Sequence, residues 1–112
     1  VMTAVARRLG DDDRRAVAMW YARLTPAPGL VPAGPPPAVY LFGDPGRDLP
    51  ACAVCHGSGG EGQGPGNPAL AGQPAAYTAE QLNRWRRAQR RNDARDIMRQ
   101  VAVVLTEPEL QA

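Results

Sequence analysis

Both cysteines and the only histidine of this chain fall within five residues, 52 to 56, in the order Cys-Ala-Val-Cys-His. Four chemistries fit two thiols spaced in this way. A redox dithiol normally lies between a strand and a helix of a βαβ unit, and the sequence offers no such unit. A structural zinc site needs four ligands, and only three are present. A disulfide between Cys52 and Cys55 would close a small and strained ring.

The fourth chemistry, covalent attachment of heme, uses every member of the cluster. Cys-x-x-Cys-His is the attachment signature of c-type heme. The thiols of Cys52 and Cys55 add to the two vinyl groups, and His56 then supplies the proximal iron ligand. We therefore favour heme over dithiol, zinc and disulfide. The iron of an electron carrier also takes a sixth ligand, for which the candidates are Met2, Met19 and Met98.

The composition predicts a small all-α fold with a thin core. The 112 residues include only one Phe, two Trp and three Tyr, whereas twelve Gly and twelve Pro gather in loops. Apolar residues recur at helical spacing, and no alternating strand pattern competes. We expect a short helix over 38–43, and capping boxes that open helices at Thr78 with Gln81 and at Thr106 with Glu109. A bound heme would supply the apolar bulk that the side chains lack.

The basic residues are all arginines, and they are unevenly distributed. The formal net charge is +2, and seven of the thirteen arginines lie between Arg84 and Arg99. This cluster suits an acidic redox partner, but a solvated helix face with one or two arginines neutralising heme propionates is the simpler interpretation. So small a net charge does not favour nucleic-acid binding. No apolar run reaches the roughly 18 residues of a transmembrane helix, so none is predicted in this chain.

A short repeat links the two ends of the sequence. Residues 2–9 read MTAVARRL and residues 98–105 read MRQVAVVL, so that Met, Val-Ala and Leu recur 96 positions apart. This predicts two copies of one structural unit. We expect residues 1–24 to end a preceding unit, 25–37 to form a Pro-rich linker and 38–112 to form a heme domain cut short in its last helix. We also expect the helix at 11–24 to dock in place of that truncated helix, in this chain or a neighbour.

Residues 38–112 resemble the class I c-type cytochromes, and among them the diheme cytochrome c4 family. The matching segments follow the family's order: ACAVCHG, NPALAGQ, YTAEQL, RRND and IMRQVAVVLTEPEL. The resemblance implies that Met98 is the sixth ligand and that Met2 is its counterpart in a preceding heme domain. It implies that the carbonyl of Pro68 accepts the Nδ1 hydrogen of His56. It also implies heme-pocket or propionate positions for Tyr77, Gln81, Trp85, Arg91 and Asn92.

The resemblance implies an electron-transfer protein rather than an enzyme, with one heme c that cycles between Fe(III) and Fe(II). A relay domain of a larger oxidoreductase or respiratory membrane complex is an alternative. A heme sensor is a further one, and it requires that Met98 not bind. The implied partners are redox proteins, such as a quinol-oxidising complex as donor and a terminal oxidase or reductase as acceptor. Covalent heme attachment in bacteria implies a periplasmic location.

Overall fold

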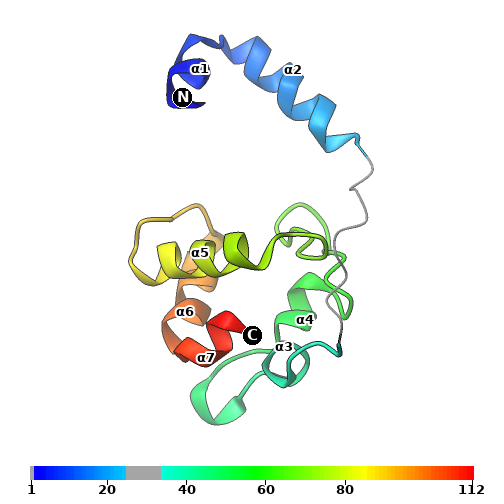
Figure 1. Cartoon of the computed structure of the whole chain (residues 1–112), viewed down its shortest axis with the longest axis vertical. Helices are drawn as coiled ribbons and strands as arrows, with labels where there is room; N and C mark the ends of the chain where they lie inside the picture. The colour runs from blue at the N-terminus through cyan, green and yellow to red at the C-terminus, as the bar shows by residue number, and fades with distance from the viewer. Residues whose placement is uncertain (1, 25–33) are drawn as a thin grey trace.

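The computed structural model describes residues 2–24 and 34–112 as short helices joined by long loops (Figure 1). Within these residues the only strand-like pairing is an isolated bridge between Asp44 and Leu49. The predicted all-α class is therefore confirmed. None of the described helices is both long and apolar enough to cross a membrane. The elements are α1 Met2–Arg8, α2 Asp11–Ala22, α3 Ala38–Phe42, 3₁₀ helix η1 Pro45–Arg47, α4 Cys52–His56, α5 Ala75–Arg86, 3₁₀ helix η2 Ala94–Asp96, α6 Ile97–Val104 and α7 Glu107–Gln111.

Three of the four helix starts predicted from the sequence agree with the structure, and the first of them, at residue 11, is the start of α2. The short helix at 38–43 is α3, and α7 opens with a capping box in which Thr106 N and Oγ1 lie 2.8 and 2.9 Å from Glu109 Oε2. The capping box at Thr78 is wrong, because α5 already begins at Ala75 after Pro74. Proline at this boundary has a fixed φ that leads into a helix, so Thr78 falls within the helix and its hydroxyl lies 3.4 Å from Pro74 O.

The hydrophobic core is small and joins the helices on either side of the cysteine motif. Its buried members are Leu49, Leu105 and Leu110, and the partly buried side chains packed against them are Val39, Leu82, Val101 and Val104. The cluster thus connects the loop before α4 with α3, α5, α6 and α7. Among the described residues no aromatic side chain is buried, as expected from the composition.

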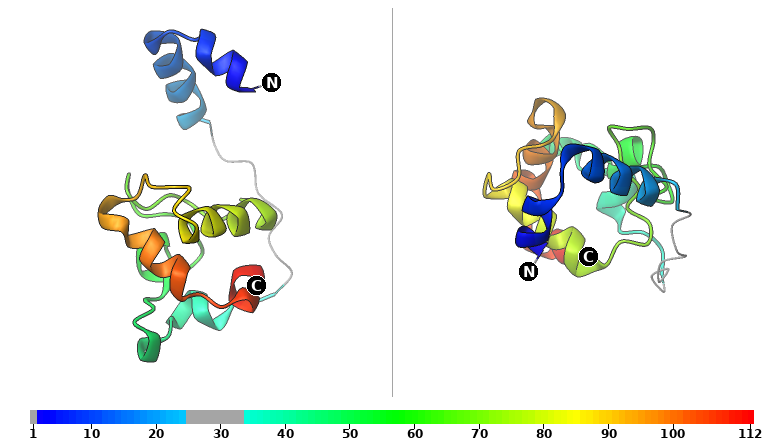
Figure 2. Two further views of the ribbon diagram at one scale, coloured as in Figure 1. Left: turned by 90° about the vertical axis from the view of Figure 1, so that its left-hand side faces the viewer. Right: turned by 90° about the horizontal axis from the view of Figure 1, so that it is seen from above.

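Helices α1 and α2 stand apart from the other elements (Figure 2). Trp20 and Tyr21 are 58% and 64% exposed, and their rings contact each other edge to face at 4.9 Å. The prediction that this helix docks in place of the truncated last helix is therefore wrong within this chain, and docking on a neighbouring chain stays a prediction. The reason is that Val39 of α3 already packs against the core cluster. Most of the predicted linker, residues 25–33, lies outside the described residues.

Arg47 ties the loop before α4 to the last helix. Its guanidinium lies 2.6 and 3.1 Å from the two carboxylate oxygens of Glu109, and its Nε lies 2.7 Å from Asp44 Oδ2. The hydrogen bond from Arg47, with smaller help from Thr106, lowers the pKa of Glu109 from 4.5 to about 2. Because the folded-state pKa is depressed, this contact stabilises the fold above pH 4.5, and the contribution is lost as the pH falls toward 2.

We expect Glu109→Gln to lower the thermal midpoint of unfolding at pH 7 by roughly 3–6 °C, as loss of a bidentate charge pair would in a domain of this size. Its stability should also fall less steeply than that of the wild type between pH 4.5 and 2. Thermal melts followed by circular dichroism across that range measure both effects. Glu80→Gln is the matched control, because the side chain of Glu80 forms no hydrogen bond with the described residues. Superimposable profiles of wild type and Glu109→Gln would contradict the prediction.

Candidate functional site

The cysteine motif folds as a single helical turn, α4, which Ala51 precedes and Gly57 ends. Residues three apart share one face of a helix, so Cys52 and Cys55 point to the same side. Both thiols are free, which excludes the disulfide interpretation here. Burial raises the pKa of the Cys52 thiol, and the charge of Cys55 adds to this. Since redox dithiols depend on a thiolate of lowered pKa, this environment also disfavours a dithiol.

His56 is the buried polar residue of the site, with 7% of its surface exposed. Its Nδ1 lies 2.8 Å from the carbonyl oxygen of Pro68, which is the pair that the family resemblance implied. A carbonyl only accepts, so this contact requires the proton on Nδ1 and leaves the Nε2 lone pair available to a metal. The same bond fixes the orientation of the ring. His56 is thus held as a single-tautomer ligand.

The glycine-rich loop after α4 brings Pro68 back to His56. Backbone hydrogen bonds fold it: Gly62 N donates to His56 O at 2.7 Å, and Leu70 N and Ala71 N donate to Gly60 O at 2.8 and 2.9 Å. The hydroxyl of Tyr40 donates to Gly57 O at 2.6 Å and fastens the loop to α3. Burial, with smaller charge effects, raises the pKa of Tyr40, so it stays protonated as the donor. The loop is therefore a fixed support for His56.

At Gly62 the backbone of this loop leaves no room for a side chain. Gly62 has φ +82°, and a Cβ there would lie 2.6 Å from Ala69 N and 2.9 Å from Asn67 O. We expect Gly62→Ala to lower the free energy of unfolding by about 2–3 kcal/mol, measured by urea denaturation. Gly64→Ala is the control, because Gly64 has φ +73° but no atom within 4 Å of the added Cβ. It should cost about 1 kcal/mol from backbone strain alone. If both variants lost the same free energy of unfolding, the close approach of Ala69 N and Asn67 O to residue 62 would be refuted.

Helix α5 and the segment after it carry the predicted pocket residues, and four of these five side chains form a hydrogen bond within the protein. Trp85 Nε1 donates to Asp93 Oδ1 at 2.9 Å, so the indole N–H has a partner within the protein. Gln81 Oε1 accepts from Arg90 at 2.8 Å, as does Asn92 Oδ1. Tyr77 is 48% exposed. Exposed Arg91 donates through Nε to Ala88 O at 3.0 Å.

Met98 is the second residue of α6 and is partly buried. Figure 1 shows α6 and α4 on opposite sides of this part of the chain, with α5 running above both. The other two methionines differ: Met2 is 73% exposed and Met19 is 48% exposed, both on the separate helices α1 and α2. Met98 is thus the methionine that belongs to the same packed unit as His56.

The residues present fit a heme better than a zinc ion. The described residues contain no group of three His, Cys, Asp or Glu side chains arranged to hold a metal ion. In contrast, the helices that carry the predicted site residues expose large hydrophobic side chains: Tyr77 on α5 is 48% exposed, and Ile97 on α6 is 43% exposed. Together with the small core, these side chains suit a large apolar group held by two thiols and one imidazole.

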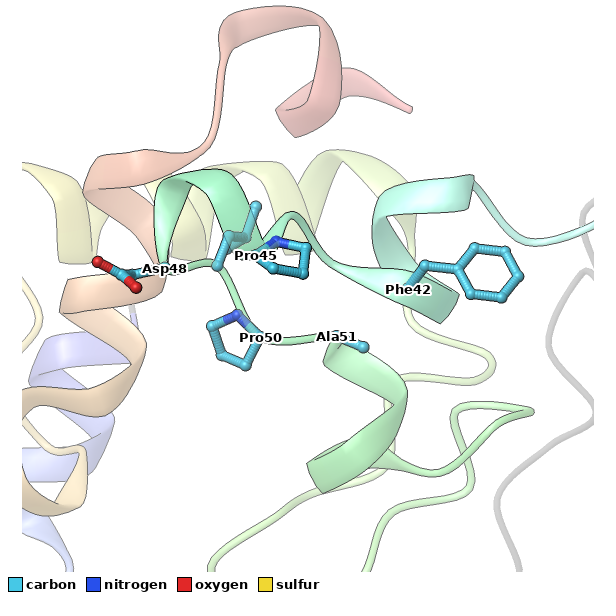
Figure 3. Close-up of a pocket in the computed structure, with 6 residues that line it drawn as sticks. Phe42, Pro45, Asp48, Pro50 and Ala51 are labelled. Carbon is cyan, nitrogen blue, oxygen red and sulfur yellow. The ribbon is translucent and has the colours of Figure 1, made fainter.

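An open hollow of about 370 Å³ lies beside the start of α4 (Figure 3). It contains no member of the Cys-Cys-His motif, and its one charged side chain is Asp48. It therefore offers no chemistry that competes with the motif. Its lining residues are Phe42, Pro45, Asp48, Leu49, Pro50 and Ala51.

Three residues that support the site were not predicted. Tyr40 anchors the loop under His56, Arg90 stacks over the Trp85 ring at 4.0 Å, and Asp93 accepts the indole hydrogen. Tyr40 gives no signal in sequence, because its partner is a backbone carbonyl 17 residues away. Arg90 and Asp93 lie in the arginine-rich segment between Arg84 and Arg99. An acidic residue among so many basic ones was the sequence signal that could have identified Asp93.

A helical chain with a buried, oriented histidine directly after Cys-x-x-Cys defines a class I c-type cytochrome domain. The chain belongs to the cytochrome c family, whose model matches residues 44–110. The heme c attachment motif of this domain is formed by Cys52, Cys55 and His56.

Several relatives align with nearly the whole chain. The thiosulfate dehydrogenase electron acceptor of Stutzerimonas stutzeri is 37% identical over all of this chain and 55% of its own length. Cytochrome c4 of Thiocapsa roseopersicina is 36% identical over 99% of this chain and 60% of its own. The chain thus spans little more than half the length of these relatives.

Solved structures show the same similarity. The chain matches thiosulfate dehydrogenase TsdBA from Marichromatium purpuratum with a TM-score of 0.86 and 39% identity, over 99% of this chain and 25% of that one. It matches cytochrome c4 from Pseudomonas stutzeri with a TM-score of 0.84 and 33% identity, over 98% of this chain and 60% of that one. Both similarities include α1 and α2, and they confirm the predicted class I fold.

Proposed function

We propose that Cys52 and Cys55 hold the heme through thioether bonds and that His56 and Met98 are its two axial ligands. The observation that carries this proposal is the buried imidazole of His56, whose Nδ1 lies 2.8 Å from Pro68 O and whose Nε2 is left for the iron. The heme, when bound, supplies one-electron chemistry. The protein's part is to keep both axial positions occupied, so that no external ligand enters and little moves on electron transfer.

The surface around the two cysteines is the proposed route for electrons. Cys55 is exposed, and the neighbouring Val54 is 69% exposed. A partner that docks here would contact the segment whose two cysteines would hold the heme. The rest of the motif, including His56, stays behind this surface.

We also propose that the chain comprises the end of one cytochrome unit and most of a second. The repeat between residues 2–9 and 98–105 supports this division, as do alignments of nearly the full chain to diheme-sized relatives. In this arrangement residues 1–24 close the first unit, residues 25–37 link the two, and residues 38–112 carry the heme of the second. Met2 then belongs to the first unit.

For the partner, we propose a thiosulfate-oxidising dehydrogenase as electron donor in the bacterial periplasm. Relatives from Stutzerimonas stutzeri and Thiomonas intermedia, 37% and 36% identical to this chain, are named thiosulfate dehydrogenase electron acceptors. Oxidised protein mixed with such a dehydrogenase should be reduced when thiosulfate is added. Reduction by a quinol-oxidising complex instead would favour the respiratory alternative.

The attachment chemistry is tested by producing the chain together with heme-attachment machinery. We expect an intact mass increased by that of one heme, a sharp ferrous spectrum and slow binding of carbon monoxide. Pigment that is released into acidified organic solvent would refute covalent attachment. Rapid binding of carbon monoxide would refute the Met98 ligand and favour a sensor.

A further inference from the structure

The segment between α5 and Met98 has a strained backbone that something must hold in place. The described residues include four non-glycine residues with positive φ, and three of them, Ala88 (55°), Arg95 (57°) and Asp96 (57°), lie in this segment. Such conformations persist only where surrounding contacts determine them. The last two directly precede α6, so the strain is placed two and three residues before Met98.

Asp93 supplies the contacts that this segment needs. Its Oδ1 accepts from Trp85 Nε1 on α5 at 2.9 Å, and its Oδ2 accepts from the backbone N–H of Arg99 on α6 at 3.1 Å. One carboxylate thus joins two helices, with both oxygens in use. The Trp85 ring is itself held by the Arg90 guanidinium, which lies 4.0 Å above it and donates to Gln81 at 2.8 Å.

The bond to Arg99 also replaces the missing cap of α6. A helix usually begins with a residue whose side chain accepts from the N2 or N3 amide. Asp96 occupies that first position but makes no such bond, and Asp93 accepts from the N3 amide instead. Met98 lies in this first turn, directly before Arg99, whose backbone N–H donates to Asp93. Its backbone position relative to α5 is therefore set by Asp93.

We propose that Asp93 is a positioning residue for Met98, whose carboxylate fixes the first turn of α6 against Trp85 and so holds the thioether sulfur in place as the axial ligand. This inference rests on the proposed ligation by Met98. Asp93 does not touch the sulfur; it acts through the backbone on either side of it. Without this tie the strained turn relaxes, and Met98 leaves the iron more often.

The test uses the full-length ferric holoprotein and follows the weak far-red absorption band that a methionine sulfur bound to iron(III) produces. Added imidazole competes with Met98, and the loss of the band gives the rate of displacement. We expect this rate to rise about tenfold in Asp93→Ala, because two hydrogen bonds to a charged group are lost. Asp93→Asn and Trp85→Phe each remove one of the two hydrogen bonds, so they should raise the displacement rate by less. These two variants test the proposal if Asp93→Ala does not fold.

Asp96→Asn is the matched control: it makes the same charge change as Asp93→Asn three residues away, at a side chain that makes no cap bond. Its displacement rate should stay within about twofold of wild type. If Asp96→Asn accelerated the displacement of Met98 as much as Asp93→Asn, the proposal would be overturned. It would also be overturned if all Asp93 and Trp85 variants kept the wild-type displacement rate, even if their free energies of unfolding fell. A wild-type holoprotein without the band would instead overturn ligation by Met98, and with it this proposal.

Discussion

Met98→Ala should lower the reduction potential of the holoprotein by roughly 100 mV or more and make its ferrous form bind carbon monoxide rapidly. A thioether sulfur favours ferrous over ferric iron, and a hundredfold preference in a one-electron couple corresponds to about 120 mV. Removing it leaves His56 as the only protein ligand and opens the sixth position. Redox titration and carbon monoxide mixing measure the two effects.

Met19→Ala is the control for this experiment. Met19 is 48% exposed on α2, away from the helices that carry His56 and Met98. Its loss should leave the potential, the far-red band and the carbon monoxide reaction unchanged. A shift of similar size in both variants, or an intact far-red band in Met98→Ala, would exclude Met98 as the ligand.

The heme motif was predictable because its chemistry depends on spacing along the chain. Cys52, Cys55 and His56 form one helical turn, and no distant residue is needed to place them relative to one another. The capping box of Thr106 and Glu109 is local in the same sense. The box predicted at Thr78 failed because Pro74 starts α5 earlier, a competition between two local signals that the pattern itself does not rank.

The contacts that hold the site together were not predictable, because they join distant segments. Arg47 and Glu109 are 62 residues apart, and nothing in the sequence around Arg47 selects that carboxylate. The same limit applies to the apolar face of α2. Its periodicity is correctly helical, but Trp20 on this face is 58% exposed in the described structure. Periodicity identifies a face that can pack, but not the surface that it packs on.

Replacing both Cys52 and Cys55 by alanine should abolish heme attachment and, with it, cooperative folding of residues 38–112. The described part of this domain buries only four hydrophobic residues, Leu49, Ala102, Leu105 and Leu110. So few side chains do not offset the conformational entropy of about 75 residues. We expect the far-UV circular dichroism of the variant to lose at least about half of the helical signal and to show no sigmoidal melt, since folding that is coupled to a cofactor fails without it.

Val54→Ala separates this effect from disturbance of α4 itself. Val54 lies between the two cysteines and is 69% exposed, so its truncation leaves the attachment chemistry intact and removes little buried surface. This variant should retain covalent heme, measured by intact mass, and a wild-type melt. A double-cysteine variant that melts as cooperatively as Val54→Ala, without heme, would show that the protein core is sufficient. In that case heme would not be required for α4, α5 and α6 to fold.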